Sequence, residues 1–108
     1  MATRFIYVTA ANPEQAKTIG EALVSERLAA CANILAPMAS IYRWQGKIQH
    51  ETEAVLIAKT RAELVDQVIA RVWALHTYTV PCIVSLAIDA GNPAFLEWIA
   101  DETRPTGT

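Results

Sequence analysis

The side chains that could carry chemistry begin with His76 and Tyr78, in the polar stretch from His76 to Pro81. A connector between two elements can present an imidazole nitrogen and a phenol hydroxyl to a cleft. The alternative is a hydrogen-bonded loop histidine beside a packed tyrosine ring. The residue types alone leave both interpretations open.

Two thiols, Cys31 and Cys82, are the next candidates. Thiolates are ligands for soft metal ions, but neither cysteine has the Cys-x-x-Cys or His-x-x-x-His spacing of an established metal motif. A free cysteine also behaves as a small buried hydrophobic residue. In a reducing compartment both are expected to be thiols and not a disulfide.

Charged and aromatic residues between positions 42 and 59 could form a binding cleft. Glu53 and Lys59 each interrupt or end an apolar run, so each needs a partner or faces a cavity. Glu51 is expected on a solvated face of the same strand. Tyr42 and Trp44 can stack on a ligand, or they can simply pack near a hairpin tip.

These residues are positioned by a long β-hairpin predicted from Cys31 to Lys59, where side chains alternate between two faces. A two-residue turn at Gln45-Gly46 would pair Trp44 with Lys47. Pro37 cannot donate to a ladder, so we expect an edge or a bulge there. Arms of more than about ten residues exceed the usual five or six, so the outer part should project and pair with a partner.

Hydrophobic periodicity and capping signals predict the remaining elements. In chain order they are a strand over Arg4–Thr9, a helix from Asn12-Pro13 to near Arg27-Leu28, the hairpin, a helix opened by a capping box at Thr60–Glu63, a buried strand over Cys82–Ile88, and a helix from Asn92-Pro93 with Phe95, Leu96 and Ile99 inward. This order predicts an α+β, ferredoxin-like βαββαβ fold with an added C-terminal helix. Two helices should cover one face of a four-stranded antiparallel sheet, and the bare apolar face favours a closed ring of subunits.

Length and composition bound the function. The 108 residues predict a single domain, 1–108, with a loose tail over 103–108. The net charge of −2 and the absence of a basic cluster argue against nucleic-acid binding. No apolar run has the length of a membrane span or the form of a signal peptide, so we expect a cytoplasmic protein.

Several enzyme classes lack their motifs here. The sequence has no Gly-x-Ser-x-Gly elbow, no P-loop and no glycine-rich dinucleotide turn. An acylphosphatase-like enzyme would need an arginine and phosphate-binding glycines after the first strand, where residues 10–13 are Ala-Ala-Asn-Pro. The expectation is a protein that is not an enzyme.

A series of short motifs runs across nearly the whole chain: Leu28 to Ile34, Pro37, Ser40-Ile41-Tyr42, Trp44, Gly46-Lys47, Glu53, Lys59-Thr60, His76, Tyr78, Pro81, Asn92 and Trp98. In this order they resemble the divalent-cation tolerance proteins of the CutA family. The resemblance implies a tight homotrimer with the architecture of the PII signalling proteins. It also implies binding of copper or another divalent metal ion between subunits, and no catalytic reaction. No metal is expected to be needed for folding.

The connector differs from the family pattern of His-Pro-Tyr, an acidic residue, one further residue and Pro-Glu. Here Thr77 replaces the proline, Thr79 the acidic residue and Cys82 the glutamate. Two lost carboxylates weaken a site for hard cations, whereas Cys82 near His76 would favour Cu(I) or Zn(II) if both reach one cavity.

Three hypotheses follow. The first is a metal site formed by His76, Cys31 and Cys82, beside a ligand cleft of Tyr42, Trp44, Glu53, Lys59 and Tyr78. The second is a PII-like signalling or scaffold trimer that binds a small anionic metabolite, with Lys59 as its charge partner. The third is an enzyme with His76 and Glu53 as an acid–base pair.

Overall fold

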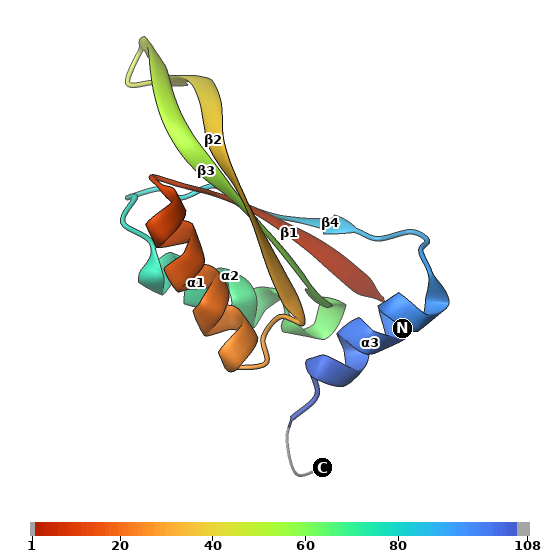
Figure 1. Ribbon diagram of the computed structural model, residues 1–108. Helices are drawn as coiled ribbons and strands as arrows, with labels where there is room; N and C mark the ends of the chain where they lie inside the picture. Colours follow the sequence, from red (N-terminus) through yellow and green to blue (C-terminus); the bar gives the residue numbers. More distant parts are fainter. Residues whose placement is uncertain (1, 106–108) are drawn as a thin grey trace.

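The computed structural model describes residues 2–105, which form one four-stranded sheet and three α-helices (Figure 1). The elements are β1 (Thr3–Ala10), α1 (Pro13–Ser25), β2 (Cys31–Trp44), β3 (Lys47–Arg61), a 3-10 turn η1 (Ala62–Leu64), α2 (Val65–Leu75), β4 (Ile83–Ala87) and α3 (Pro93–Glu102). The strand order is β2-β3-β1-β4, and each neighbouring pair is antiparallel. The predicted α+β element order is confirmed.

Helices α1 and α2 lie on one face of the sheet, and the main core fills the space between (Figure 1). Ile6, Leu56 and Val68 are fully buried there. Gly20 of α1 lies close to the sheet, because a Cβ at this position would lie 3.0 Å from the Cβ of Ala32 and 3.2 Å from Cδ1 of Leu56. A larger residue here would push α1 away from the strands.

The hairpin has the register predicted from its turn. Trp44 pairs with Lys47, and Gln45 and Gly46 both have positive φ angles, 51° and 78°, as a tight hairpin turn requires. A register shift between Leu35 and Met38 places the predicted irregularity at Pro37. Since β1 pairs with β3 only from Ala54 onward, the outer hairpin projects beyond the rest of the sheet (Figure 1).

The two ends of α1 are set by local chemistry. The Asn12 side chain accepts from the Gln15 amide at 2.8 Å, as expected of a helix cap, and the Gln15 side chain accepts from the Ala11 amide at 3.0 Å. The helix ends at Ser25, two residues before the expected end, because Arg27 adopts a left-handed φ of 59°.

The capping box predicted at Thr60–Glu63 is wrong. Thr60 is still part of β3, is fully buried, and donates its hydroxyl to the Leu28 carbonyl at 2.6 Å. Glu63 forms an ion pair with Arg61 at 2.9 Å. Helix α2 instead begins at Val65, after η1 and without a side-chain cap.

Two burial predictions are also wrong for the single chain. The strand β4 is shorter than Cys82–Ile88, and Val84 and Leu86 are 47% and 49% exposed because they project from the face opposite α1 and α2. Phe95 of α3 does not point inward: it is 40% exposed and stacks on Trp98, with ring centroids 5.6 Å apart, whereas Ile99 is buried.

We call the sheet face opposite α1 and α2 the open face; Tyr7, Leu35, Glu53, Val84 and Leu86 project from it. At one end α3 packs against β1 and β3, and Thr103, which the sequence placed in a loose tail, is buried and accepts from Arg61 Nε at 3.0 Å. Residues 106–108 of that tail lie outside the described residues. Within residues 2–105 no helix is long and apolar enough to cross a membrane.

Candidate functional site

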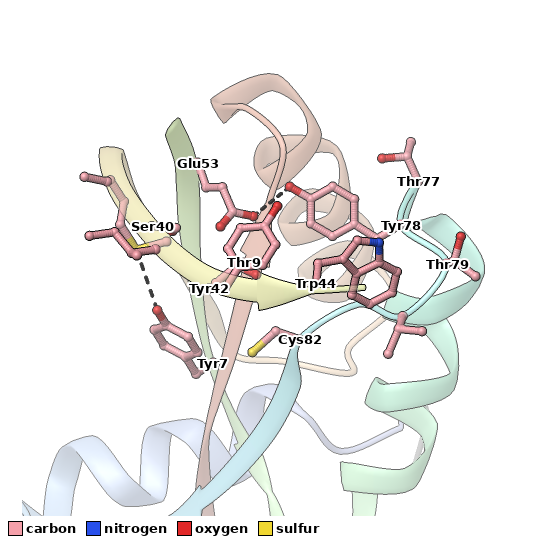
Figure 2. Close-up of a pocket in the computed structure, with 14 residues that line it drawn as sticks. Tyr7, Thr9, Ser40, Tyr42, Trp44, Glu53, Thr77, Tyr78, Thr79 and Cys82 are labelled. Carbon is pink, nitrogen blue, oxygen red and sulfur yellow. Dashed lines mark hydrogen bonds between the residues drawn. The ribbon is translucent and has the colours of Figure 1, made fainter. Parts of the chain in front are cut away.

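A cavity of about 780 Å³ lies between the projecting hairpin, the outer half of β1 and the connector that follows α2 (Figure 2). Of the eight predicted site residues, it is lined by Tyr42, Trp44, Glu53, Tyr78 and Cys82. These residues come from two strands and one connector, and Tyr78 is 25 positions away from Glu53. Of the five residues predicted for a ligand cleft, all but Lys59 therefore line one cavity within a single chain.

The carboxylate of Glu53 is the main charged group of this cavity. It is only 8% exposed, and the Tyr78 hydroxyl donates to its Oε2 at 2.7 Å. Burial, followed by the hydrogen bond to Glu53 and the charge of its carboxylate, raises the pKa of Tyr78, so the phenol keeps its proton and remains a donor. Among residues 2–105 no lysine, arginine or histidine forms an ion pair with Glu53.

His76 is not among the residues that line the cavity, but it holds the connector in place. Its Nε2 lies 2.7 Å from the Thr9 carbonyl oxygen, and its Nδ1 accepts from the Tyr78 amide at 3.1 Å. Because a carbonyl oxygen can only accept, Nε2 is the donor in this contact. Both nitrogens are therefore engaged, and the ring packs on that of Tyr78 with centroids 4.6 Å apart.

Tyr42 and Trp44 stand at alternate positions of β2 and so project from the same side of the hairpin. Both rings are partly exposed. Desolvation, together with the negative charges of Glu51 and Glu53, raises the pKa of Tyr42. Glu51 and Glu53 therefore place negative charge near this ring.

Two sulfur atoms also belong to the cavity. Cys82 lines it and is exposed, and Met38 lines it from β2, where its Sδ accepts from the Tyr7 hydroxyl at 3.7 Å. Neither Tyr7 nor Met38 was among the residues predicted for the site. The available signal was Pro37, because the bulge beside it sets which face of β2 each following side chain occupies.

Cys31 and Lys59 lie elsewhere. They are paired on the open face, where Lys59 Nζ donates to Asn33 Oδ1 at 2.7 Å and lies 3.8 Å from Cys31 Sγ. Thr9 lines the cavity together with Cys82, and its register partner on β3 is Val55. Val55 is four residues from Lys59 along β3, which corresponds to about 13 Å. One chain therefore does not bring Cys31 to Cys82, and within residues 2–105 no three His, Cys, Asp or Glu side chains form a metal-binding group.

Comparison with known proteins gives a consistent result. The family model described as CutA1 divalent ion tolerance protein matches residues 4–102. The divalent-cation tolerance protein CutA of Thermus thermophilus is 46% identical over 98 residues, covering 91% of this chain and 95% of that protein. The chloroplastic CutA 1 protein of rice is 43% identical over 99 residues, covering 92% of this chain; the chain spans about half of that relative, 56% of its length.

Solved structures agree with the sequence matches. The divalent cation tolerance protein of Thermus thermophilus superposes with a TM-score of 0.92 at 44% identity, covering 94% of this chain and 99% of that one. CutA1 from Oryza sativa superposes with a TM-score of 0.93 at 40% identity, covering 98% and 97%. The four-stranded antiparallel sheet and three helices are shared with these structures.

Proposed function

The chain belongs to the CutA1 divalent ion tolerance family, and from this premise we propose that it acts in cation tolerance as a homotrimer that binds copper or another divalent metal ion in clefts between subunits. The metal ion is the cargo of this function and not a cofactor of a reaction. We expect the subunit to fold without a metal, and the apolar core between the sheet and α1 and α2 supports this expectation.

The observation that carries the proposal is the environment of Glu53. A nearly buried carboxylate with a single neutral donor pays a desolvation cost that a bound cation would offset. Cys82 and Met38 line the same cavity and supply a thiol and a thioether. Sulfur ligands favour copper over hard cations such as magnesium.

One subunit offers an incomplete ligand set, so the site requires donors from a second subunit. His76 can join it only by giving up its hydrogen bond to Thr9 or to the Tyr78 amide. We therefore assign His76 first to positioning the connector, and expect Cys82 to contribute more to metal affinity.

Assembly into a ring is supported by the open face and the strand edges. Leu35, Val84 and Leu86 are exposed there, and the outer hairpin has no further strand beside it within residues 2–105. Pairing with neighbouring copies would cover these side chains and satisfy the edges. Sedimentation equilibrium would measure the oligomeric state directly, and we expect a trimer.

The two other hypotheses fit the geometry less well. A small anion would find Glu53 in the cavity, whereas Lys59 is bonded to Asn33 outside it. A Glu53–His76 acid–base pair is not assembled, because Tyr78 bonds to both residues and both imidazole nitrogens are used.

The test is a titration of the metal-free protein with copper and zinc against a competing chelator, under reducing conditions. We expect Glu53→Gln to weaken binding by about tenfold or more, which corresponds to the loss of one charged ligand. Glu51→Gln is the matched control, since Glu51 lies two residues further out on the same strand and is exposed. Equal affinities for wild type and Glu53→Gln would refute the proposed site.

A further inference from the structure

The cavity has aromatic walls that a metal ion alone would not need. Tyr7, Tyr42, Trp44 and Tyr78 all line it, from β1, β2 and the connector. Figure 2 shows the rings of Tyr42, Trp44 and Tyr78 gathered at one side and Tyr7 at the other. Within residues 2–105, Tyr78 packs on His76, and none of these four rings stacks on another of the four.

The charged side chain among the residues that line this space is a carboxylate. Glu53 lies at the inner wall, and no lysine or arginine is among the lining residues. The Tyr78 hydroxyl donates to Oε2 of Glu53, and within residues 2–105 Oε1 accepts no hydrogen bond. Electron-rich ring faces and a carboxylate both attract a cation and repel an anion.

The size of the cavity separates two kinds of cation. Metal ligands lie within about 2.0 to 2.6 Å of the ion, so a metal site uses only a small part of the space. In a single chain the volume of about 780 Å³ falls in the range typical of small-molecule sites, and in the proposed trimer a neighbouring subunit would form the remaining wall. A ligand with an extended body would use the rings that the metal leaves without a role.

From these observations we infer that the cavity binds a small organic cation, an amine or quaternary ammonium compound, whose charge lies between Glu53 and the ring faces of Tyr42 and Trp44. The rings provide cation–π attraction and apolar contact, and the carboxylate provides the counter-charge. This inference does not depend on metal binding.

The experiment compares two ligands that differ only in charge. Choline is titrated into the metal-free protein by calorimetry and tryptophan fluorescence, alongside the alcohol in which a tert-butyl group replaces the trimethylammonium group. We expect saturable choline binding at least about tenfold tighter than binding of the neutral alcohol. Equal affinity for the two compounds, or no saturable choline binding, would overturn the inference.

Variants locate the site. Trp44→Leu should weaken choline binding about tenfold or more, whereas Trp44→Phe keeps a ring and should retain most of it. Trp73→Leu is the matched control, because Trp73 is 53% exposed on α2 and does not line the cavity. Weakening by Trp73→Leu comparable to that by Trp44→Leu would place the binding elsewhere and refute the assignment. Circular dichroism checks that each variant is folded.

The result is separable from the metal proposal. Copper binding that depends on Glu53, without choline binding, would overturn this inference and leave the proposed function intact. Choline binding without copper binding would do the reverse.

Discussion

The inner half of β3, residues 54–61, and its outer half, residues 47–53, use polar residues in opposite ways. In the inner half, Thr60 donates to the Leu28 carbonyl, Lys59 to Asn33, and Arg61 to Thr103, so each polar side chain finds its partner within the chain. In the outer half, Glu53 faces a cavity with one neutral donor. The comparison teaches that one strand can treat its polar residues differently along its length: the inner half commits them to folding, and the outer half leaves a carboxylate facing the cavity proposed to bind a ligand.

The largest expected effect is a loss of unfolding free energy when a core residue of the inner half is truncated. Leu56→Ala in the inner half should reduce the free energy of unfolding by about 2–5 kcal/mol, because Leu56 is fully buried and its removal leaves a cavity. Ile48→Ala in the outer half is the matched change, at a side chain that is 60% exposed, and should cost less than about 1 kcal/mol in a single chain. Urea unfolding at several protein concentrations measures both, and similar losses at low concentration would contradict the division.

A smaller loss of unfolding free energy is expected when the buried hydroxyl of Thr60 is removed. Thr60→Val removes the donor to Leu28 without changing the side-chain shape, and should reduce the free energy of unfolding by about 1–3 kcal/mol because the buried carbonyl loses its partner. Thr52→Val in the outer half, where the side chain is exposed, should change it by about 0.5 kcal/mol or less. An unchanged stability for Thr60→Val would show that the inner half does not rely on this bond.

The smallest effect is a pH dependence that belongs to the outer half. The pKa of Tyr78 is raised in the folded state above its ordinary value of 10.0. Folding therefore retains this proton more tightly, and its contribution is fully present below pH 10 and lost as pH rises through the raised pKa. Tyr78→Phe should flatten the fall in unfolding free energy above pH 10, measured by denaturant titration at each pH. Some slope should remain because the pKa of Tyr42 is also raised.

An identical slope in wild type and Tyr78→Phe would show that burial and the contact with Glu53 do not raise the pKa of Tyr78 in solution. Tyr7→Phe is the control, since its hydroxyl contacts the neutral Met38 sulfur and not a carboxylate.

Much of this fold could be predicted because its determinants are local. The Asn12 cap, the Gln45-Gly46 turn and the alternation along β3 each depend on neighbouring residues, and all were predicted. The capping box at Thr60 was mispredicted because a tertiary bond to Leu28 outweighed the local pattern.

The site was less predictable because its contacts join distant segments. The bonds of Tyr78 to Glu53 and of His76 to Thr9 span 25 and 67 positions, and no local spacing encodes them. The separation of Cys31 from Cys82 follows from strand register, which places Cys31 beside Lys59. Residue types therefore identified the candidates, whereas strand register determines which of them share a cavity.

The two cysteines provide the most direct test of the division between the halves. Copper affinity of the reduced, metal-free protein should be measured against a competing chelator for wild type, Cys82→Ser and Cys31→Ser. We predict that Cys82→Ser, in the cavity, weakens copper binding by about tenfold or more, whereas Cys31→Ser, beside Lys59, leaves it nearly unchanged. Loss of affinity in Cys31→Ser with none in Cys82→Ser would contradict the account and move the metal site to the inner half.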